Sequence, residues 1–209
     1  MRQIQSKINI VGKIRHWNLV PLLAHVSHGD CHYLVYEFMK NGSLQDVLDE
    51  ASNGTKELDL LARYKIALGV EIRLEHMHFL HNPCIIHRDL KPANLLLDND
   101  MEARISYFGL AKVMPDANIY ITGFNVAGTI GYIAPEYLQT QKFIAKFDIY
   151  SFGVLLGVLV IGKKPTDLFF HNMDGICLAK WLWNVMASDY PLQQKICCNT
   201  LLQQKKIVA

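Results

Sequence analysis

The chain has 209 residues, of which 51% are hydrophobic and 19% charged, and its formal net charge is +2. It is long and apolar enough to bury one or two compact cores, whereas its weak charge gives no reason to expect binding to nucleic acid or to an anionic membrane. The five cysteines are an odd number without a C-x-x-C pair, which argues against a disulfide framework or a zinc site and favours a reducing, cytoplasmic environment.

The first third of the chain predicts a helix, a hairpin and a second helix. Isoleucine and valine recur at helical spacing over residues 2–14. Two apolar, branched segments at 19–26 and 31–39 flank a segment of turn composition at 27–30, which indicates a β-hairpin. Ser43 and Asp46 form a capping box that opens a short helix through residue 48.

The remaining elements are mainly helical. A helix is predicted over 59–80, short apolar runs at 84–86 and 95–97 bracket a polar loop, and a long glycine-containing loop covers 107–133. Helices resume after Pro135. The apolar stretch 149–161 is shorter than the ~18 residues of a membrane span and predicts a helix buried on all sides. The tail 191–209 shows no clear pattern.

The segment His87-Arg88-Asp89-Leu90-Lys91-Pro92-Ala93-Asn94 resembles the catalytic loop of protein kinases. In such a loop an aspartate accepts the proton of the substrate hydroxyl, and an asparagine five residues later holds a metal ion. Asp89 is therefore the candidate base, Asn94 the candidate metal ligand, and Lys91 the candidate cation for the transferred phosphoryl group.

Other motifs follow in the kinase order. They are Phe108-Gly109, Gly128-Thr129, Ala134-Pro135-Glu136, Asp148-Ile149-Tyr150-Ser151-Phe152-Gly153 and, upstream, Leu34-Val35-Tyr36-Glu37 with Asn41-Gly42-Ser43-Leu44. Together they resemble the plant leucine-rich-repeat receptor-like serine/threonine kinases, and among these the immune co-receptor type that partners receptor-like proteins.

The resemblance implies an α+β, protein-kinase-like fold. Residues 1–39 would be a remnant of the N-lobe, one helix and two strands ending in the hinge strand; 40–190 would be the mainly helical C-lobe, with the catalytic loop at 87–94 and the activation loop at 107–136; and 191–209 would be a divergent tail that need not be ordered.

The resemblance also assigns roles to individual residues. Tyr36, Glu37, Met39 and Leu96 would surround the adenine of ATP. His87 would pack on Phe108, Arg88 would pair with a phosphorylated activation loop, Asp148 would position the catalytic loop, and Glu136 would form a buried ion pair with an arginine that this sequence does not contain. Thr122 and Thr129 are the Ser or Thr residues of the activation loop, and Thr129 would bond near Asp89 and Lys91.

Three departures from the family pattern predict an inactive chain. The glycine-rich loop and the strand lysine that hold the ATP phosphates do not precede the first helix, Lys7 stands where the family has a glutamate, and Tyr107 replaces the main magnesium-binding aspartate. ATP and magnesium are the family cofactors, and we expect both to bind weakly or not at all.

Three functions remain open at this stage. The chain could be a residually active serine/threonine kinase, a pseudokinase scaffold that binds a partner kinase or a receptor-like protein, or a truncated gene copy without a selected function. We expect neither binding to nucleic acid nor insertion of this chain into a membrane. The resemblance implies a cytoplasmic location, since the relatives are single-pass receptors whose kinase domains lie at the cytoplasmic face of the plasma membrane.

His76, His78 and His81 have no carboxylate or cysteine spaced to complete a metal site, so their clustering is interpreted as chance.

Overall fold

The structure is a computed structural model that describes residues 20–29, 31–115, 121–122, 128–140, 142–171 and 177–187. The helix predicted over 2–14 and the tail 191–209 lie outside these residues. The chain divides into two compact units, Met1–Leu156 and Gly157–Ala209. The described part is mainly helical with a few short strands, as the predicted fold class requires.

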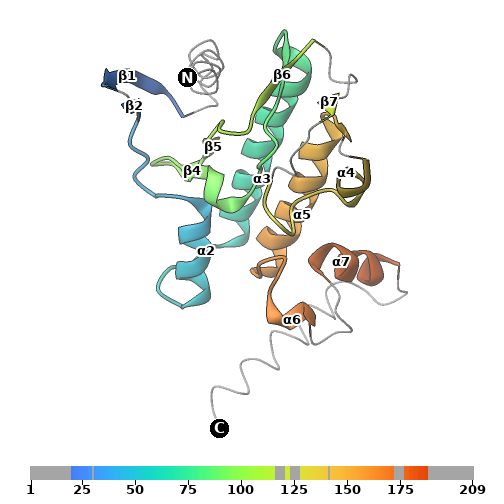
Figure 1. The fold of residues 1–209 in the computed structure, drawn as a ribbon. Coiled ribbons are helices and arrows are strands. Elements are labelled where there is room, and N and C mark those ends of the chain that lie inside the picture. Colours follow the sequence, from blue (N-terminus) through green and yellow to red (C-terminus); the bar gives the residue numbers. More distant parts are fainter. Residues whose placement is uncertain are drawn as a thin grey trace. The chain divides into compact units, whose positions relative to one another are not determined.

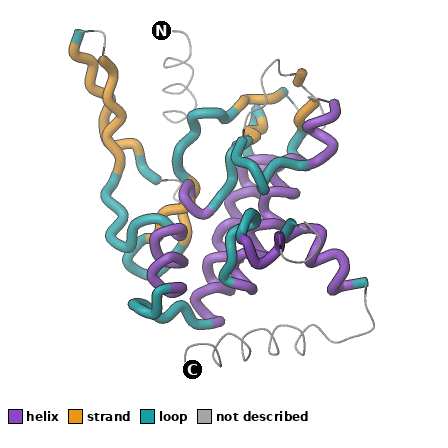
Figure 2. The backbone as a smooth tube through the Cα atoms, turned by 60° about the horizontal axis from the view of Figure 1, so that its bottom comes forward, coloured by secondary structure: helices purple, strands orange, loops and turns teal. Residues whose placement is uncertain are grey.

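A β-hairpin opens the described part of the chain (Figures 1 and 2). Strands β1 (Leu22–His28) and β2 (Cys31–Tyr36) are antiparallel, in a register that runs from Leu22 opposite Tyr36 to His28 opposite Cys31. The strands extend further into the predicted turn than expected, because Gly29 adopts a positive φ of 59° that permits a tighter connection.

Two capped helices follow. Helix α2 (Leu44–Ser52) begins with the predicted capping box, in which the Ser43 hydroxyl accepts from the backbone of Asp46 at 3.2 Å and the Asp46 carboxylate accepts from the backbone of Ser43 at 3.0 Å. Helix α3 (Leu60–Glu75) is capped by Asp59 and continues into one π-helical turn, η1 (His76–Leu80). The predicted helix over 59–80 therefore changes its winding in its last turn.

Short antiparallel strand pairs frame the loops that carry the motifs. Strand β3 (Cys84–Ile86) pairs with β6 (Lys112–Met114), β4 (Leu95–Leu97) with β5 (Ala103–Ile105), and β7 (Ile121–Thr122) with β8 (Lys142–Phe143). Between β3 and β4 lies a single 3-10 turn, η2 (Pro92–Asn94). The segment 107–133 was predicted as an irregular loop and instead contains β6 and β7. Strands of two or three residues are too short to leave a periodic signal, and their partners lie far away in the sequence.

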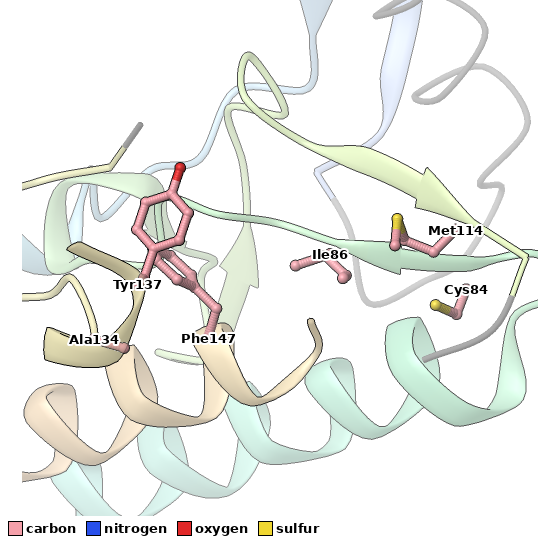
Figure 3. Close-up of a cluster of buried hydrophobic side chains, with 6 residues drawn as sticks. All are labelled: Cys84, Ile86, Met114, Ala134, Tyr137 and Phe147. Carbon is pink, nitrogen blue, oxygen red and sulfur yellow. The ribbon is translucent and has the colours of Figure 1, made fainter. Parts of the chain in front are cut away.

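A buried apolar cluster connects this strand framework to the helices that follow it. Figure 3 shows Cys84, Ile86 and Met114 along β3 and β6, and the rings of Tyr137 and Phe147 next to each other. These two rings meet edge to face, with centroids 5.0 Å apart. Tyr137 belongs to α4 (Pro135–Thr140) and Phe147 to α5 (Lys146–Ile161).

Helix α5 corrects one expectation. Val154, Leu155 and Val158 are buried, but Ile149, Leu156 and Val160 are 47%, 37% and 55% exposed. The helix is apolar all round, yet only part of its circumference is covered, because an apolar sequence can fill a core only where other elements pack against it. No helix in the described ranges is both long and apolar enough to cross a bilayer.

The second unit contains the end of α5, α6 (Leu168–His171) and α7 (Leu178–Met186). Trp181 of α7 makes edge contacts with the rings of Phe169 and Phe170 of α6, at centroid distances of 6.3 and 6.0 Å. Phe170 and Trp181 are buried, as are Val158, Leu159 and Leu178, and these side chains form the core of this unit among its described residues.

Candidate active site

The catalytic loop is held by a buried carboxylate from the first turn of α5. Asp148 is fully buried and accepts hydrogen bonds from the backbone N–H groups of His87 at 2.7 Å and Arg88 at 2.8 Å. These bonds support a strained segment, because Arg88 has a positive φ of 70°. The loop shape therefore depends on a residue about sixty positions further along the chain.

His78 supplies a third bond to the same carboxylate. Its Nε2 donates to Asp148 at 2.9 Å, and both side chains are completely buried. Burial alone would raise the pKa of Asp148, but the hydrogen bond from His78, the electrostatic interactions with His78 and His87 and the bond from the Arg88 backbone together lower this pKa below its ordinary value. Asp148 is therefore a carboxylate in the folded protein.

His87 connects the loop to the segment that follows β5. Its Nε2 donates to the carbonyl of Ser106 at 2.9 Å, its Nδ1 accepts from the backbone of Asp89 at 3.3 Å, and its ring meets that of Phe108 edge to face at 5.2 Å. Both ring nitrogens of His87 thus have structural partners. This arrangement leaves His87 no nitrogen free to exchange a proton with a substrate.

Asp89 lies at the centre of a network that includes the other loop residues. The Thr129 hydroxyl donates to Asp89 Oδ1 at 2.6 Å and accepts from Lys91 Nζ at 2.7 Å. The Asn94 amide donates to Asp89 Oδ2 at 2.9 Å and to the Asp89 carbonyl at 2.7 Å, and Lys91 Nζ lies 3.3 Å from Asp89 Oδ2. The sequence-predicted catalytic residues are thus brought together in the structure.

This network can bind an alcohol next to a base. The Thr129 hydroxyl occupies the position that an acceptor hydroxyl would need in order to give its proton to Asp89. Lys91 lies beside that oxygen as a fixed cation, so it would stabilise negative charge that develops there. Chemically, the arrangement fits the acceptor half of a group-transfer site.

An apolar pocket of about 280 Å³ lies beside this network and is lined by Val20, Leu34, Tyr36, Leu96, Ser106, Tyr107, Phe108 and Gly109. Burial raises the pKa of the Tyr36 phenol above its ordinary value, so this phenol is a neutral hydrogen-bonding group. The pocket has the size and the apolar lining that suit a planar aromatic ring. None of its lining residues carries a positive charge that could bind phosphate groups.

Position 107 offers no charged oxygen ligand to a magnesium ion. Tyr107 has a φ of 58° and a side chain that is 60% exposed, and it offers a neutral phenol where a hard cation would need a carboxylate. The amide nitrogen of Asn94 is directed to Asp89. Within the described ranges no group of three or more His, Cys, Asp or Glu side chains could hold a metal ion.

Three predicted site residues, Glu37, Met39 and Thr122, lie outside both the network around Asp89 and the apolar pocket. Glu37 is exposed and its N–H donates to the Pro21 carbonyl at 2.9 Å, while Met39 is buried; neither lines the pocket, so their role toward an adenine stays a prediction. Thr122 belongs to β7, opposite Lys142.

Two charged residues for which the resemblance implies ionic partners, Glu136 and Arg88, differ in burial. Glu136, in the first turn of α4, is exposed rather than buried, so its carboxylate keeps its contact with water and does not need a buried arginine to offset a loss of hydration. Arg88 is buried and donates to the Leu110 carbonyl at 3.3 Å. Its pairing with a phosphorylated loop stays a prediction.

Sequence reasoning missed His78 and Arg73. Both continue the buried face that Ile66, Val70 and Leu74 mark on α3. A polar residue on a buried helical face requires a partner, and that signal was present in the sequence: His78 follows Leu74 by four residues.

The comparisons with known proteins agree with this geometry. The protein kinase domain family matches residues 1–201. The leucine-rich repeat receptor-like serine/threonine/tyrosine-protein kinase SOBIR1 of Arabidopsis thaliana is 64% identical over 191 residues, which cover 91% of this chain and 30% of that protein.

Two further relatives are more distant. Protein BRASSINOSTEROID INSENSITIVE 1 of Arabidopsis thaliana and the systemin receptor SR160 of Solanum peruvianum are each 45% identical over 166 residues, 79% of this chain and 14% of those proteins. The chain thus spans less than a third of the length of these three relatives. It belongs to the protein kinase domain family and resembles the plant receptor-like kinases.

Proposed function

We propose that this chain is a receptor-like kinase domain that does not transfer phosphate at the rates of its family and that acts by binding another protein. The observation that carries this proposal is Tyr107, which stands in the position of the metal-binding aspartate that precedes Phe-Gly in protein kinases. The acceptor side of the site is assembled around Asp89, whereas the metal side has no carboxylate at position 107.

The size of the expected defect follows from electrostatics. Protein kinases as a family use ATP and magnesium, and the metal ions neutralise charge on the transferred phosphoryl group. Removing one preorganised electrostatic element lowers a rate by about 10²–10³-fold. Asn94 alone would not replace the missing ligand, because magnesium requires charged oxygen ligands and gives up its waters reluctantly.

Nucleotide would bind weakly for the same reason. The pocket beside Tyr36 and Leu96 could accept the adenine ring, but its lining provides no cation for the phosphates. The partner would be a protein, either a partner kinase or a receptor-like protein, and the proposed location is cytoplasmic, at the inner face of the plasma membrane. This proposal is supported by two relatives whose names describe a receptor-like kinase and a receptor, SOBIR1 and the systemin receptor SR160.

A second candidate function is a residually active serine/threonine kinase. It is favoured by the distances that join Thr129 to Asp89 and Lys91, at 2.6 and 2.7 Å, since an acceptor hydroxyl could replace Thr129 there. The two proposals differ in one measurable quantity, which is Asp89-dependent phosphate transfer.

The deciding experiment compares the chain with its Asp89→Ala variant. Both are incubated with radiolabelled ATP, magnesium and a generic basic protein substrate, and incorporation of label into the chain and into the substrate is counted. We expect the two proteins to incorporate equally little label. A contaminating kinase would contribute equally to both samples, so the difference between them isolates this site.

Label that disappears in the Asp89→Ala variant would establish the residually active kinase instead. A Tyr107→Asp variant tests the reason given for inactivity by a separate readout. It should gain magnesium-dependent affinity for ADP in calorimetry, and unchanged affinity would show that position 107 is not the limiting defect.

A further inference from the structure

We propose that His25 and His32 on the β1–β2 hairpin form a binding site for a divalent transition-metal ion that prefers imidazole nitrogen, such as Cu²⁺ or Zn²⁺. This site shares no residue with the candidate active site, although Leu34, the partner of His25 in the hairpin, also lines the apolar pocket. The proposal does not depend on the function proposed above.

The strand register places the two histidines on the same face of the hairpin. Leu34 lies opposite His25, and His32 lies opposite Ser27. Paired residues share a face, and side chains alternate along each strand, so His25 and His32 are diagonal neighbours. Diagonal neighbours are close enough for aromatic side chains to meet.

The two rings do meet through their nitrogens. Nε2 of His25 and Nδ1 of His32 are 3.2 Å apart, and the rings are nearly parallel, with an interplanar angle of 15° and centroids 5.4 Å apart. One nitrogen must donate its proton to the lone pair of the other. In this contact the lone pair of the accepting nitrogen points toward the donating nitrogen, so the two possible metal ligands already face each other.

This separation suits chelation of one ion. Metal–nitrogen bonds of about 2.0–2.1 Å at a near-tetrahedral angle place two nitrogens about 3.3 Å apart, close to the 3.2 Å observed. Moving the shared proton to the other nitrogen of the donor ring frees both lone pairs, so two neutral imidazoles bind the ion without releasing a proton. Because His25 is exposed and His32 half-buried, both rings can turn toward the ion.

The surroundings do not oppose a cation. Ser27 and Leu34 are the neighbours of the pair on this face, and neither is charged. Since no third histidine, cysteine or carboxylate joins the pair among the described residues, water would fill the other positions. Two imidazoles select copper and zinc over magnesium and calcium, and Cu²⁺ should bind more tightly than Zn²⁺.

The test uses the full chain without an affinity tag. Cu²⁺ and Zn²⁺ are titrated by calorimetry, and the Cu²⁺ complex is examined by electron paramagnetic resonance, which detects coordinated nitrogen. We expect His25→Ala and His32→Ala each to weaken binding by at least about tenfold and to reduce the nitrogen coupling in the spectrum to that of one imidazole. The control is His28→Ala: His28 belongs to the same strand but pairs with Cys31 on the opposite face.

Ions bound elsewhere in the chain are identified by the double variant His25→Ala/His32→Ala, whose titration is subtracted. Binding that is the same in the double variant and the parent chain would overturn the proposal, as would an equal loss in His28→Ala. Because both histidines lie outside the buried core, circular dichroism should show that the variants keep the parent fold. If either alanine variant loses the hairpin, His25→Gln and His32→Gln repeat the test with side chains that retain polarity.

Discussion

Replacing Arg73 by methionine should stabilise the protein. Arg73 lies on the inner face of α3 and is only 3% exposed. Burial, together with repulsion from Arg104, lowers the pKa of Arg73 from its ordinary 12.5 to about 10, although the charges of Glu102 and Asp98 partly offset the shift. The protein therefore keeps a cation where the folded state disfavours it.

The expected gain can be worked out from that shift. The fall in pKa from 12.5 to about 10 corresponds to about 3 kcal/mol. Methionine is an unbranched residue of similar length, but the substitution loses the hydrogen bond from the Arg73 guanidinium to the Gly69 carbonyl, worth about 1 kcal/mol. We expect a net stabilisation of about 2 kcal/mol and a rise in Tm of about 4–8 °C, measured by thermal and urea unfolding.

A double-mutant cycle with Gly69→Ala makes this prediction sharper. A Cβ atom at Gly69 would lie 2.6 Å from Arg73 Nη1, whereas its other neighbours, backbone atoms of Ala103, are at an ordinary 3.7 Å. Gly69→Ala should therefore destabilise the parent chain and stabilise the Arg73→Met chain by about 1 kcal/mol through helix propensity.

The reasoning would be refuted if Arg73→Met lowered the free energy of unfolding by more than 1 kcal/mol, or if the effects of the two substitutions simply added. Either result would mean that the hydrogen bonds and ion pairs of Arg73 outweigh the loss of its hydration.

Three further predictions concern the catalytic loop and the pocket. Asp148→Asn should destabilise the protein by about 3 kcal/mol. Because the pKa of Asp148 in the folded protein lies below its ordinary value of 3.8, the stability that this carboxylate contributes is present above pH 3.8 and is lost as pH falls through the folded pKa. The urea midpoint should therefore fall more steeply between about pH 5 and pH 2 for the parent protein than for the variant. Gly128→Ala should cost about 1–3 kcal/mol, because Gly128 has a φ of 121° and an added Cβ would lie 3.1 Å from the Arg88 carbonyl; a Tm equal to that of the parent would contradict this. Millimolar ATP with magnesium should leave Tm unchanged, whereas a ligand at 100 times its Kd would stabilise by about 2.7 kcal/mol and raise Tm by about 5 °C or more.

Local signals predicted much of the fold. Ser43 and Asp46 interact with each other's backbone, so the start of α2 could be read from a four-residue pattern. The apolar runs at 84–86 and 95–97 were expected to bracket a polar loop, and they form the strands β3 and β4 on either side of the catalytic loop. The hairpin followed from two branched segments and a glycine turn.

What could not be predicted depends on contacts between distant residues. Strand β6 exists because Lys112–Met114 pairs with Cys84–Ile86, and three residues carry no periodicity of their own. His78 was interpreted as chance because its partner, Asp148, is seventy residues away. Tyr107 shows the opposite case: its identity alone raised the question of metal binding, and the structure added only its exposure and its backbone conformation.

The anchoring of the catalytic loop by Asp148 affects how such sequences change over evolutionary time. His87 and Asp148 make buried hydrogen bonds that fix the backbone of the loop, so selection for a folded protein alone would keep them. Lys91 is more exposed, with a quarter of its side chain open to water. Its side-chain contacts in the network described above are with Asp89 and Thr129, and neither contact holds the backbone of the loop. In copies of this gene that no longer transfer phosphate, position 91 should therefore change long before positions 87 and 148. A preserved His87 together with a preserved Asp148 would then indicate only that the protein must fold, and not that it transfers phosphate.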